Sequence, residues 1–426
     1  MEMKSDITAI KETIERVTSK LSHRPKLAQL FQNCYPNTLE TTFQQLEDGT
    51  AFVITGDIPA MWLRDSSAQV RHYIGDAVKD SELADMIKGV IRKQMFYINL
   101  DPYANAFNRE GNNHGHKDDI TEHNPWVWER KYEIDSLCYP IQLAYLFWKA
   151  TGDIEIFDDV FQEAVLNILD LWTKEQRHEQ SPYTFERLNC PETDTLSYGG
   201  RGTPVAYTGM TWSGFRPSDD ACTYGYLVPA NMFAAVALRY IVEINKDVLR
   251  HQDIGRRSQL LLDEIEEGIQ TYAITEHPVY GRIYAYETDG MGNYNLMDDA
   301  NVPSLLSLPY LGYCKADDPV YLNTRRFILS KDNPYYFAGE KAKGIGSPHT
   351  PHNYIWHIAL AMQGLTTEDP EELEQLLVLL ETTDADTGFM HEGFDVNDPG
   401  KFTRPWFAWA NSICSELIMK YVDEGE

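Results

Sequence analysis

Six segments of this chain are apolar on nearly every face of a helix, and long polar loops separate them. They begin near residues 66, 136, 221, 300, 352 and 405. A segment with a single apolar stripe follows each of the first five, and the first such stripe consists of Leu83, Met86, Ile87, Val90, Ile91, Met95 and Ile98. Helices that are apolar all round lie inside a fold, and helices with one apolar stripe lie at its outside. The pattern therefore predicts six inner helices and five outer ones.

A sixth outer position would close these helices into a ring, and the two polar helices expected within residues 5–48 can fill it. We therefore predict an all-α fold, an (α/α)6 barrel or toroid of six helical hairpins, formed by one domain over residues 1–426. No self-similar repeat of 20–50 residues is visible, which makes a solenoid less plausible. Strand signals are confined to loops, near residues 51–54 and 279–285.

The polar loops are predicted to converge on one rim of the barrel, because all six inner helices run in the same direction. Aromatic residues are concentrated there. Of the nine Trp residues, seven lie in or just after these loops: Trp62, Trp126, Trp128, Trp212, Trp356, Trp406 and Trp409. Aromatic faces pack on sugar C–H groups, and carboxylates and Arg bridge sugar hydroxyls. This composition indicates a carbohydrate site.

The charge of the chain narrows its partners. Asp and Glu number 65 against 37 Lys and Arg, a formal net charge of −28. So acidic a chain should repel nucleic acid and anionic membranes, which favours a neutral substrate. No stretch approaches the roughly 18 apolar residues of a membrane span. The six Cys are scattered, without paired spacing, as expected of reduced thiols in a cytoplasmic protein. No obligate protein partner is evident.

Rim acids supply the chemistry that an uncharged sugar would need, because two carboxylates without a metal can hydrolyse a glycosidic bond. Ten acids lie in the loops: Asp65, Glu129, Glu133, Asp135, Asp219, Asp220, Asp298, Asp299, Glu392 and Asp395. Composition alone cannot choose among them.

Two of these acids stand out by their local sequence. Asp219 follows Trp212 and Phe215 and precedes Asp220, so partial burial and a like charge are expected to raise its pKa, as a general acid requires. The alternative is that it caps a helix beginning at residue 221. Glu392 lies in a Gly-bounded loop with aromatic residues; the alternative there is a solvated loop acid.

Three motifs carry a resemblance to a known family. They are Ile58-Pro59-Ala60-Met61-Trp62-Leu63-Arg64-Asp65-Ser66, Phe215-Arg216-Pro217-Ser218-Asp219-Asp220-Ala221-Cys222 and His391-Glu392-Gly393-Phe394. Together they resemble family 125 of the glycoside hydrolases, whose members are bacterial and fungal exo-α-1,6-mannosidases. The resemblance runs over essentially the whole chain. It implies an (α/α)6 fold, a mannose-containing oligosaccharide substrate and an inverting mechanism without metal or other cofactor.

The resemblance also implies roles for residues. Asp219 would be the general acid and Glu392 the general base; a slip of one position would exchange Asp219 for Asp220, and we prefer Asp219. Arg64 and Asp65 would hold the terminal mannose. Candidates for further contacts with the substrate are Trp62, Asn124, Tyr132, Asp135, Asp220, His352, Asn353 and Arg404.

The sequence is also compatible with other hypotheses about function. His114, His116, Asp118, Asp119 and His123 could bind zinc, as could a second cluster of His349, His352 and His357, although no Cys or HExxH spacing supports zinc. A calcium-dependent mannosidase is also possible with an acidic rim. A sugar epimerase would use His349, His352 and His391 as acid and base. The last alternative is a glycan-binding protein without catalysis.

Overall fold

The computed structural model describes residues 7–424 and arranges their helices in two concentric rings. The inner positions are α3 (Leu63–Arg71), α6 (Asp135–Thr151), α9 (Val228–Ile244), α11 (Leu308–Leu311), α13 (His357–Leu365) and α15 (Ala408–Glu424). Within this ring α3 contacts α6, α6 contacts α9, α9 contacts α11, α13 contacts α15, and α15 contacts α3 again.

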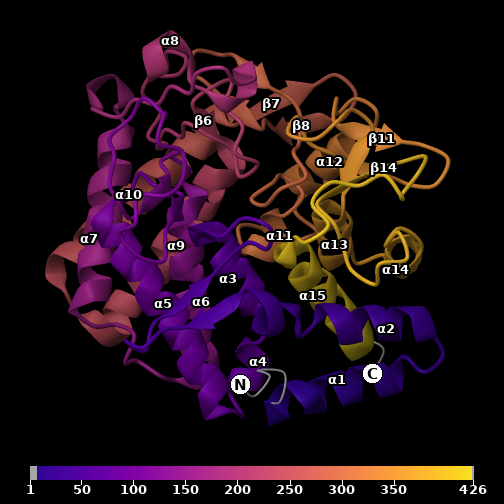
Figure 1. Cartoon of the computed structure of the whole chain (residues 1–426). Helices are drawn as coiled ribbons and strands as arrows, with labels where there is room; N and C mark the ends of the chain where they lie inside the picture. The colour runs from indigo at the N-terminus through magenta and orange to yellow at the C-terminus, as the bar shows by residue number, and fades with distance from the viewer. Residues whose placement is uncertain (1–6, 425–426) are drawn as a thin grey trace.

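The outer positions surround this ring (Figure 1). They are α5 (Ser81–Leu100), α7 (Asp159–Glu175), α10 (Gln252–Tyr272), α12 (Pro319–Ile328), α14 (Pro370–Thr382) and α2 (Pro25–Cys34), which packs with α1 (Thr8–Lys20). The N-terminal helices contact α14 and α15 and so occupy the sixth outer position, as predicted. The prediction of an (α/α)6 barrel is confirmed.

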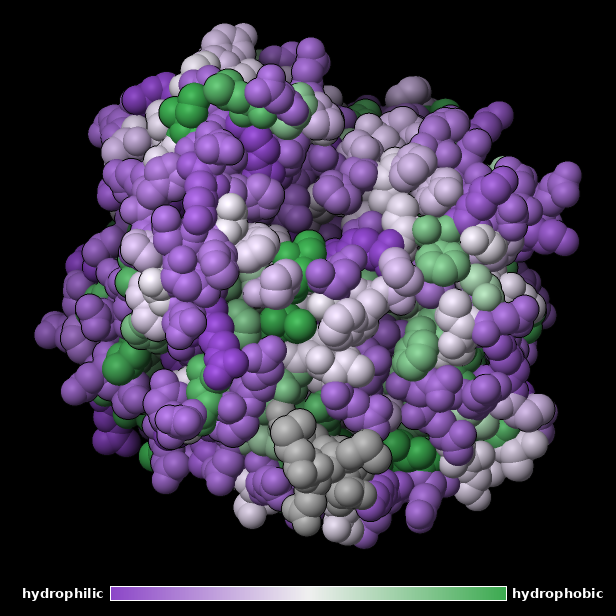
Figure 2. Space-filling model, in the orientation of Figure 1, coloured by the Kyte–Doolittle hydropathy of each residue, from purple (hydrophilic) through white to green (hydrophobic). Residues whose placement is uncertain are grey.

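Helices of the inner and outer rings differ in how many of their faces are buried, as their hydrophobic patterns indicate. In α9 every residue from Val228 to Leu238 is buried, whereas α10 buries one stripe that includes Ile254, Leu261, Ile265 and Ile269. The face drawn in Figure 2 is mostly hydrophilic, with hydrophobic side chains in small separate patches. Within residues 7–424, no helix combines the length and the apolar character needed to cross a membrane.

Four inner helices begin later than predicted: α13 at His357 and α15 at Ala408 are late by a few residues, and the third and fourth are late by more. The third was expected from residue 221 but starts at Val228, where Pro229 occupies the first turn. The preceding residues form a turn and strand β6 (Tyr226–Leu227) instead. The fourth was expected over residues 300–313, yet only Leu308–Leu311 are helical. The turn before it is held by Asp298, whose carboxylate accepts from the N–H groups of Leu305 and Leu306 at 2.8 and 3.0 Å.

Short antiparallel sheets lie in the loops and lead into inner helices. Strand β3 (Met61–Trp62) directly precedes α3, and β13 (Tyr354–Trp356) directly precedes α13. β3 pairs with β4 (Ala106–Phe107), which pairs with β5 (Val127–Glu129); β13 pairs with β14 (Gly393–Asp395). The remaining strands are β1 (Phe43–Gln45), β2 (Ala51–Val53), β7 (Ile274–His277), β8 (Gly281–Tyr284), β9 (Glu287–Thr288), β10 (Tyr294–Asn295), β11 (Tyr336–Ala338) and β12 (Lys343–Ile345). Strands β2 and β8 lie where strand signals were expected, and the loop pairings fix the backbone beside the pocket described next.

Candidate active site

A polar pocket opens at the N-terminal ends of the inner helices, where the loops were predicted to converge. Its lining residues come from the loops and first turns around α3, α9, α11, α13 and α15: Thr55, Ile58, Trp62, Arg64, Asp65, Ser218, Asp219, Asn301, His349, Trp356, Glu392, Arg404 and Phe407. Residues far apart in the sequence thus meet in one pocket that carries three carboxyls and two Arg side chains.

The predicted site residues fall into three groups. Those that line the pocket are Trp62, Arg64, Asp65, Asp219, Glu392 and Arg404. Asp135 and Asp220 lie behind it, paired with the lining residues Arg64 and His349. Asn124, Tyr132, His352 and Asn353 are not among the lining residues: Asn124 accepts from the N–H of Trp126, Tyr132 packs against Trp212, and His352 packs against Phe337. The carbonyl of Asn353 accepts from the N–H of Val396.

Asp219 faces the pocket because a tight turn separates it from Asp220. Its φ is +67°, a left-handed conformation that Asp tolerates better than most residues, and its N–H donates to the carbonyl of Arg216 at 2.9 Å. The Nζ of Lys131 donates to the carbonyl of Asp219 at 2.7 Å. Asp220 points away and lies 3.7 Å from Nδ1 of His349. The predicted alternative of a helix cap is wrong, because α9 begins only at Val228.

Arg64 is the cationic centre of the site. Its side chain is 3% exposed, and its guanidinium lies 2.6 Å from Glu133, 3.0 Å from Asp135 and 3.5 Å from Asp219. One guanidinium cannot neutralise three carboxylates together with neighbouring Asp65. Burial accordingly raises the pKa of Asp65 to about 6 despite Arg64 and Arg404, and it raises the pKa of Glu133 well above the usual carboxyl range.

The prediction that the pKa of Asp219 is raised is wrong for the site without substrate. Burial does act to raise it, but the charges of Arg64 and Lys131 and a hydrogen bond from Glu133 outweigh burial and lower the pKa of Asp219 to about 2. Local sequence could not reveal this, because Arg64 and Lys131 reach Asp219 from distant loops. The neighbouring carboxyl whose pKa is raised is that of Glu133, which lies directly behind Asp219.

Glu392 is held in place rather than solvated, so the alternative of a loop acid is wrong. Its side chain is 6% exposed and immediately precedes β14, which pairs with β13. The backbone before it is fixed, since the N–H of His391 donates to Nδ1 of His357 at 3.0 Å. Arg404 lies 3.6 Å from the Glu392 carboxyl and is itself bound by Asp57.

Sequence reasoning missed several lining residues. Asn301 donates to the carbonyl of Pro217 at 2.7 Å and so supports the loop that carries Asp219. His349 was considered only as a metal ligand or an epimerase residue, yet it lines the pocket, and its pKa is raised to about 9 because contact with Asp220 outweighs burial. Only their position in the sequence could have indicated them: His349 lies late in a rim loop, and Asn301 closely follows the acidic pair Asp298 and Asp299. Asn105, behind the pocket, carried no signal.

The competing sites do not assemble in the described part of the chain. Between residues 7 and 424 no three His, Cys, Asp or Glu side chains are placed to hold a metal ion. In the first His cluster, Asp119 is paired with Arg187 at 2.7 Å. Of the three histidines expected for an epimerase, only His349 lines the pocket; His391 is buried and stacks on Phe402.

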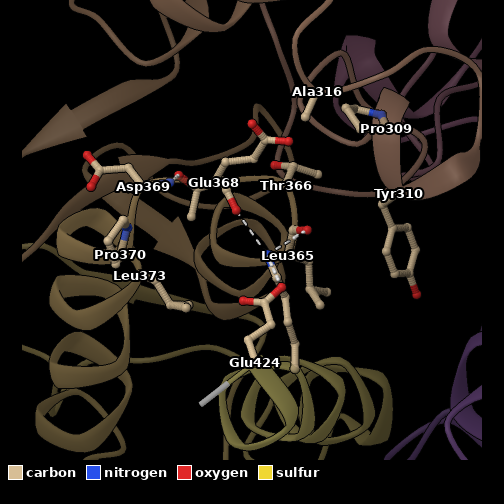
Figure 3. A pocket seen from close by; sticks show the side chains of 12 residues that line it. Pro309, Tyr310, Ala316, Leu365, Thr366, Glu368, Asp369, Pro370, Leu373 and Glu424 are labelled. Atoms are coloured by element: carbon tan, nitrogen blue, oxygen red, sulfur yellow. Dashed lines mark hydrogen bonds and ion pairs between the residues drawn. The ribbon is translucent and has the colours of Figure 1, made fainter. Parts of the chain in front are cut away.

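A larger cavity, about 440 Å³, lies beside the C-terminal ends of α13 and α15, and Figure 3 shows the side chains that line it. It is lined by Pro309 and Tyr310 of α11, by Ala316, by residues 365–370 and Leu373 between the end of α13 and the first turn of α14, and by Lys420 and Glu424 at the end of α15. The Nζ of Lys420 donates to the carbonyls of Gly364, Leu365 and Thr367 at 3.0, 3.3 and 2.9 Å. Lys420 thus caps the C-terminal end of α13, which is a structural role.

A toroid of helical hairpins whose rim pocket is lined by three carboxyls and two Arg side chains is suited to a glycoside hydrolase. The chain belongs to family 125 of the glycoside hydrolases: the family model described as metal-independent alpha-mannosidase matches residues 24–419. The chain is therefore an α-mannosidase of this family.

Several known proteins resemble the chain over most of its length. The Meiotically up-regulated gene 157 protein of Schizosaccharomyces pombe is 41% identical over 97% of this chain and 86% of its own length. A solved metal-independent α-mannosidase of Streptococcus pneumoniae, in a non-productive complex with α-1,6-mannobiose, is 51% identical, with a TM-score of 0.96 over 97% of this chain and 98% of that one. A glucoamylase from Saccharomycopsis fibuligera, 13% identical with a TM-score of 0.56 over 99% of this chain and 98% of that one, shares the fold.

Trp62 offers a direct test of the pocket as a binding site. Its side chain lines the pocket, and its indole N–H has no hydrogen-bond partner within residues 7–424. We expect Trp62→Phe, which keeps an aromatic face but removes this donor, to weaken mannose binding about tenfold, or ~1.4 kcal/mol. Titration calorimetry with mannose would measure it. Unchanged affinity, with an unchanged melting temperature, would show that Trp62 serves only packing.

Proposed function

We propose that this α-mannosidase is an inverting exo-α-1,6-mannosidase, with Asp219 as general acid and Glu392 as general base. The observation that carries the proposal is that these two carboxyls line one pocket from separate loops, one before α9 and the other before α15. Asp220, the alternative acid, lies behind the pocket against His349.

The reaction follows from two carboxyls on opposite sides of the anomeric carbon. Asp219 protonates the leaving oxygen as the C1–O bond breaks, and Glu392 takes a proton from the water that forms the new C1–O bond. Such a pair has to be roughly 6.5–9.5 Å apart, because a water must fit between the base and the sugar. The buried Arg64 and Asp65 would hold hydroxyls of the terminal mannose, as the proposed exo action requires.

The substrate linkage is proposed from the relative of known structure. The Streptococcus pneumoniae protein was solved with α-1,6-mannobiose and is described in terms of N-linked glycan processing. Because the two chains are 51% identical over nearly their full lengths, we propose that this enzyme cleaves the same linkage, in fragments of N-linked glycans. The cytoplasmic location expected from the sequence stays a prediction; it is supported by six unpaired Cys residues.

Proton NMR of the anomeric signals during digestion of α-1,6-mannobiose, with EDTA present, tests linkage and stereochemistry together. We expect β-mannose to appear first and the α-anomer to follow only by mutarotation, because water attacks the face opposite the leaving group. Initial α-mannose would mean a retaining mechanism and a misassigned pair. Absence of mannose from this substrate, with release from other α-mannobioses, would overturn the linkage.

A further inference from the structure

A second carboxyl, that of Glu133, lies directly behind Asp219. One Asn105 amide nitrogen lies 3.3 Å from Oε1 of Glu133 and 3.4 Å from Oδ1 of Asp219. Arg64 also contacts both, at 2.6 Å from Oε2 of Glu133 and 3.5 Å from Oδ1 of Asp219. The hydroxyl of Ser136 donates to Oε2 of Glu133 at 2.9 Å. Asn105 and Arg64 therefore each contact both carboxyls, which places the two carboxyls side by side.

The surroundings disfavour two negative charges on this pair. The charged groups around it are Arg64 and Asp65 of α3, Glu129 and Lys131 at and after the end of β5, Asp135 of α6, and His349 of the loop before α13; Asp220, next to Asp219 in the chain, contacts His349. Lys131 is already engaged by Asp194 and by the carbonyl of Asp219. The Glu133 side chain is fully buried, whereas that of Asp219 is 27% exposed. Only Asp219 therefore connects the pair to the pocket.

We infer that Glu133 and Asp219 share one proton, and that Glu133 passes this proton to Asp219 when Asp219 acts on the leaving oxygen. The inference rests on the proposed role of Asp219. Like carboxyls placed this close cannot both ionise at little cost, so the last proton of the pair is held tightly. The free site fits this arrangement, since burial raises the pKa of Glu133 while Arg64 and Lys131 hold that of Asp219 low.

Protons are balanced over one turnover. The Asp219 O–H bond breaks, and its proton binds the leaving oxygen, which takes the electron pair of the broken C1–O bond. Glu392 accepts one proton from the attacking water and releases it to solvent. The carboxyl pair takes one proton back from solvent through Asp219, so the enzyme ends in its starting state.

Glu133→Gln tests the inference, with Glu129→Gln as matched control. Glu129 is also buried and accepts from the same Asn105 nitrogen, at 3.0 Å. In Glu133→Gln, Asp219 lies beside Arg64 and Lys131 without the acid that contacts the same two donors. We expect kcat/KM for α-1,6-mannobiose at neutral pH to fall about 100-fold, while dinitrophenyl α-mannoside, whose leaving group needs no proton, falls less than about tenfold.

The pH profile separates proton supply from structure. The acid works only while protonated, so activity is lost as pH rises through the pKa of the carboxyl pair. We expect the alkaline limb for mannobiose to move at least about one unit to lower pH in Glu133→Gln and to stay in place in Glu129→Gln. Equal losses on both substrates with an unmoved limb would overturn the inference and leave Glu133 a structural role.

The wild-type enzyme provides a measurement that does not depend on the variant folding. In the ratio of kcat/KM for mannobiose to kcat/KM for the dinitrophenyl glycoside, the titration of groups needed for both substrates, such as Glu392, cancels. We expect this ratio to fall only well above the usual pKa range of carboxyls; a fall near pH 4 would overturn the inference. If Asp219→Asn retained full activity on mannobiose, the proposed acid would fail and the inference with it. If Asp219→Asn is inactive but Glu133→Gln matches its control, only the inference fails.

Discussion

Asp219→Asn should reduce hydrolysis of α-1,6-mannobiose by about 100- to 10,000-fold, the usual contribution of a general acid. The amide has nearly the shape of the carboxyl and can keep the contacts of Asp219 with Arg64 or Asn105 in part, so the pocket should persist. It cannot protonate the leaving oxygen. Initial rates on mannobiose and on dinitrophenyl α-mannoside would show the loss, which should be far smaller for the second substrate because its leaving group departs unprotonated.

Asp220→Asn is the natural control for this prediction. Asp220 is the adjacent carboxyl, but it is buried and contacts His349 and Ser218 behind the pocket. Its substitution should lower the activity on both substrates alike, through the position of His349. If Asp219→Asn kept near-normal turnover of mannobiose and Asp220→Asn lost it selectively, the acid would be Asp220 and the turn at φ +67° would have to differ in the complex.

The ring of helices could be predicted because the hydrophobic pattern of each helix indicates how many of its faces are buried. Inner helices such as α9 are apolar on every face, and outer ones such as α10 are apolar on one, so alternation along the chain is enough to order them. Helix starts were less predictable. Apolar residues before Val228 and Leu308 continue the pattern without being helical, because Pro229 and the Asp298 turn set where the helices begin.

The site was predictable only in part, for a physical reason. Asp219 and Glu392 could be selected from local motifs that resemble a known family. The protonation of Asp219 could not be predicted, since it depends on Arg64, Lys131 and Glu133, which approach from other loops. Asn105 shows the same limit: its one amide contacts Glu129, Glu133 and Asp219, and nothing in its neighbourhood in the sequence indicates that role.

Glu392→Gln should be as damaging as the loss of the acid, because the glutamine cannot accept a proton from the attacking water. The side chain lies in a fixed backbone beside Arg404, so the substitution should leave the fold unchanged. Azide, which attacks without giving up a proton, should then restore turnover of the dinitrophenyl glycoside. NMR of the product should show β-mannosyl azide, since azide would occupy the place of water on the face opposite the leaving group.

Asp395→Asn makes a matched control in the same hairpin. Asp395 ends β14, and its carboxylate accepts from the N–H of Asn397 at 2.8 Å without lining the pocket. It should keep near-normal activity and gain nothing from azide. Rescue of Glu392→Gln with an α-configured azide would instead indicate a retaining enzyme in which Glu392 protonates or deprotonates on the leaving-group side. The configuration of this one product therefore decides whether Glu392 acts on the face opposite the leaving group, as proposed here, or on the leaving-group side. This decision does not depend on how far the rates of the variants fall.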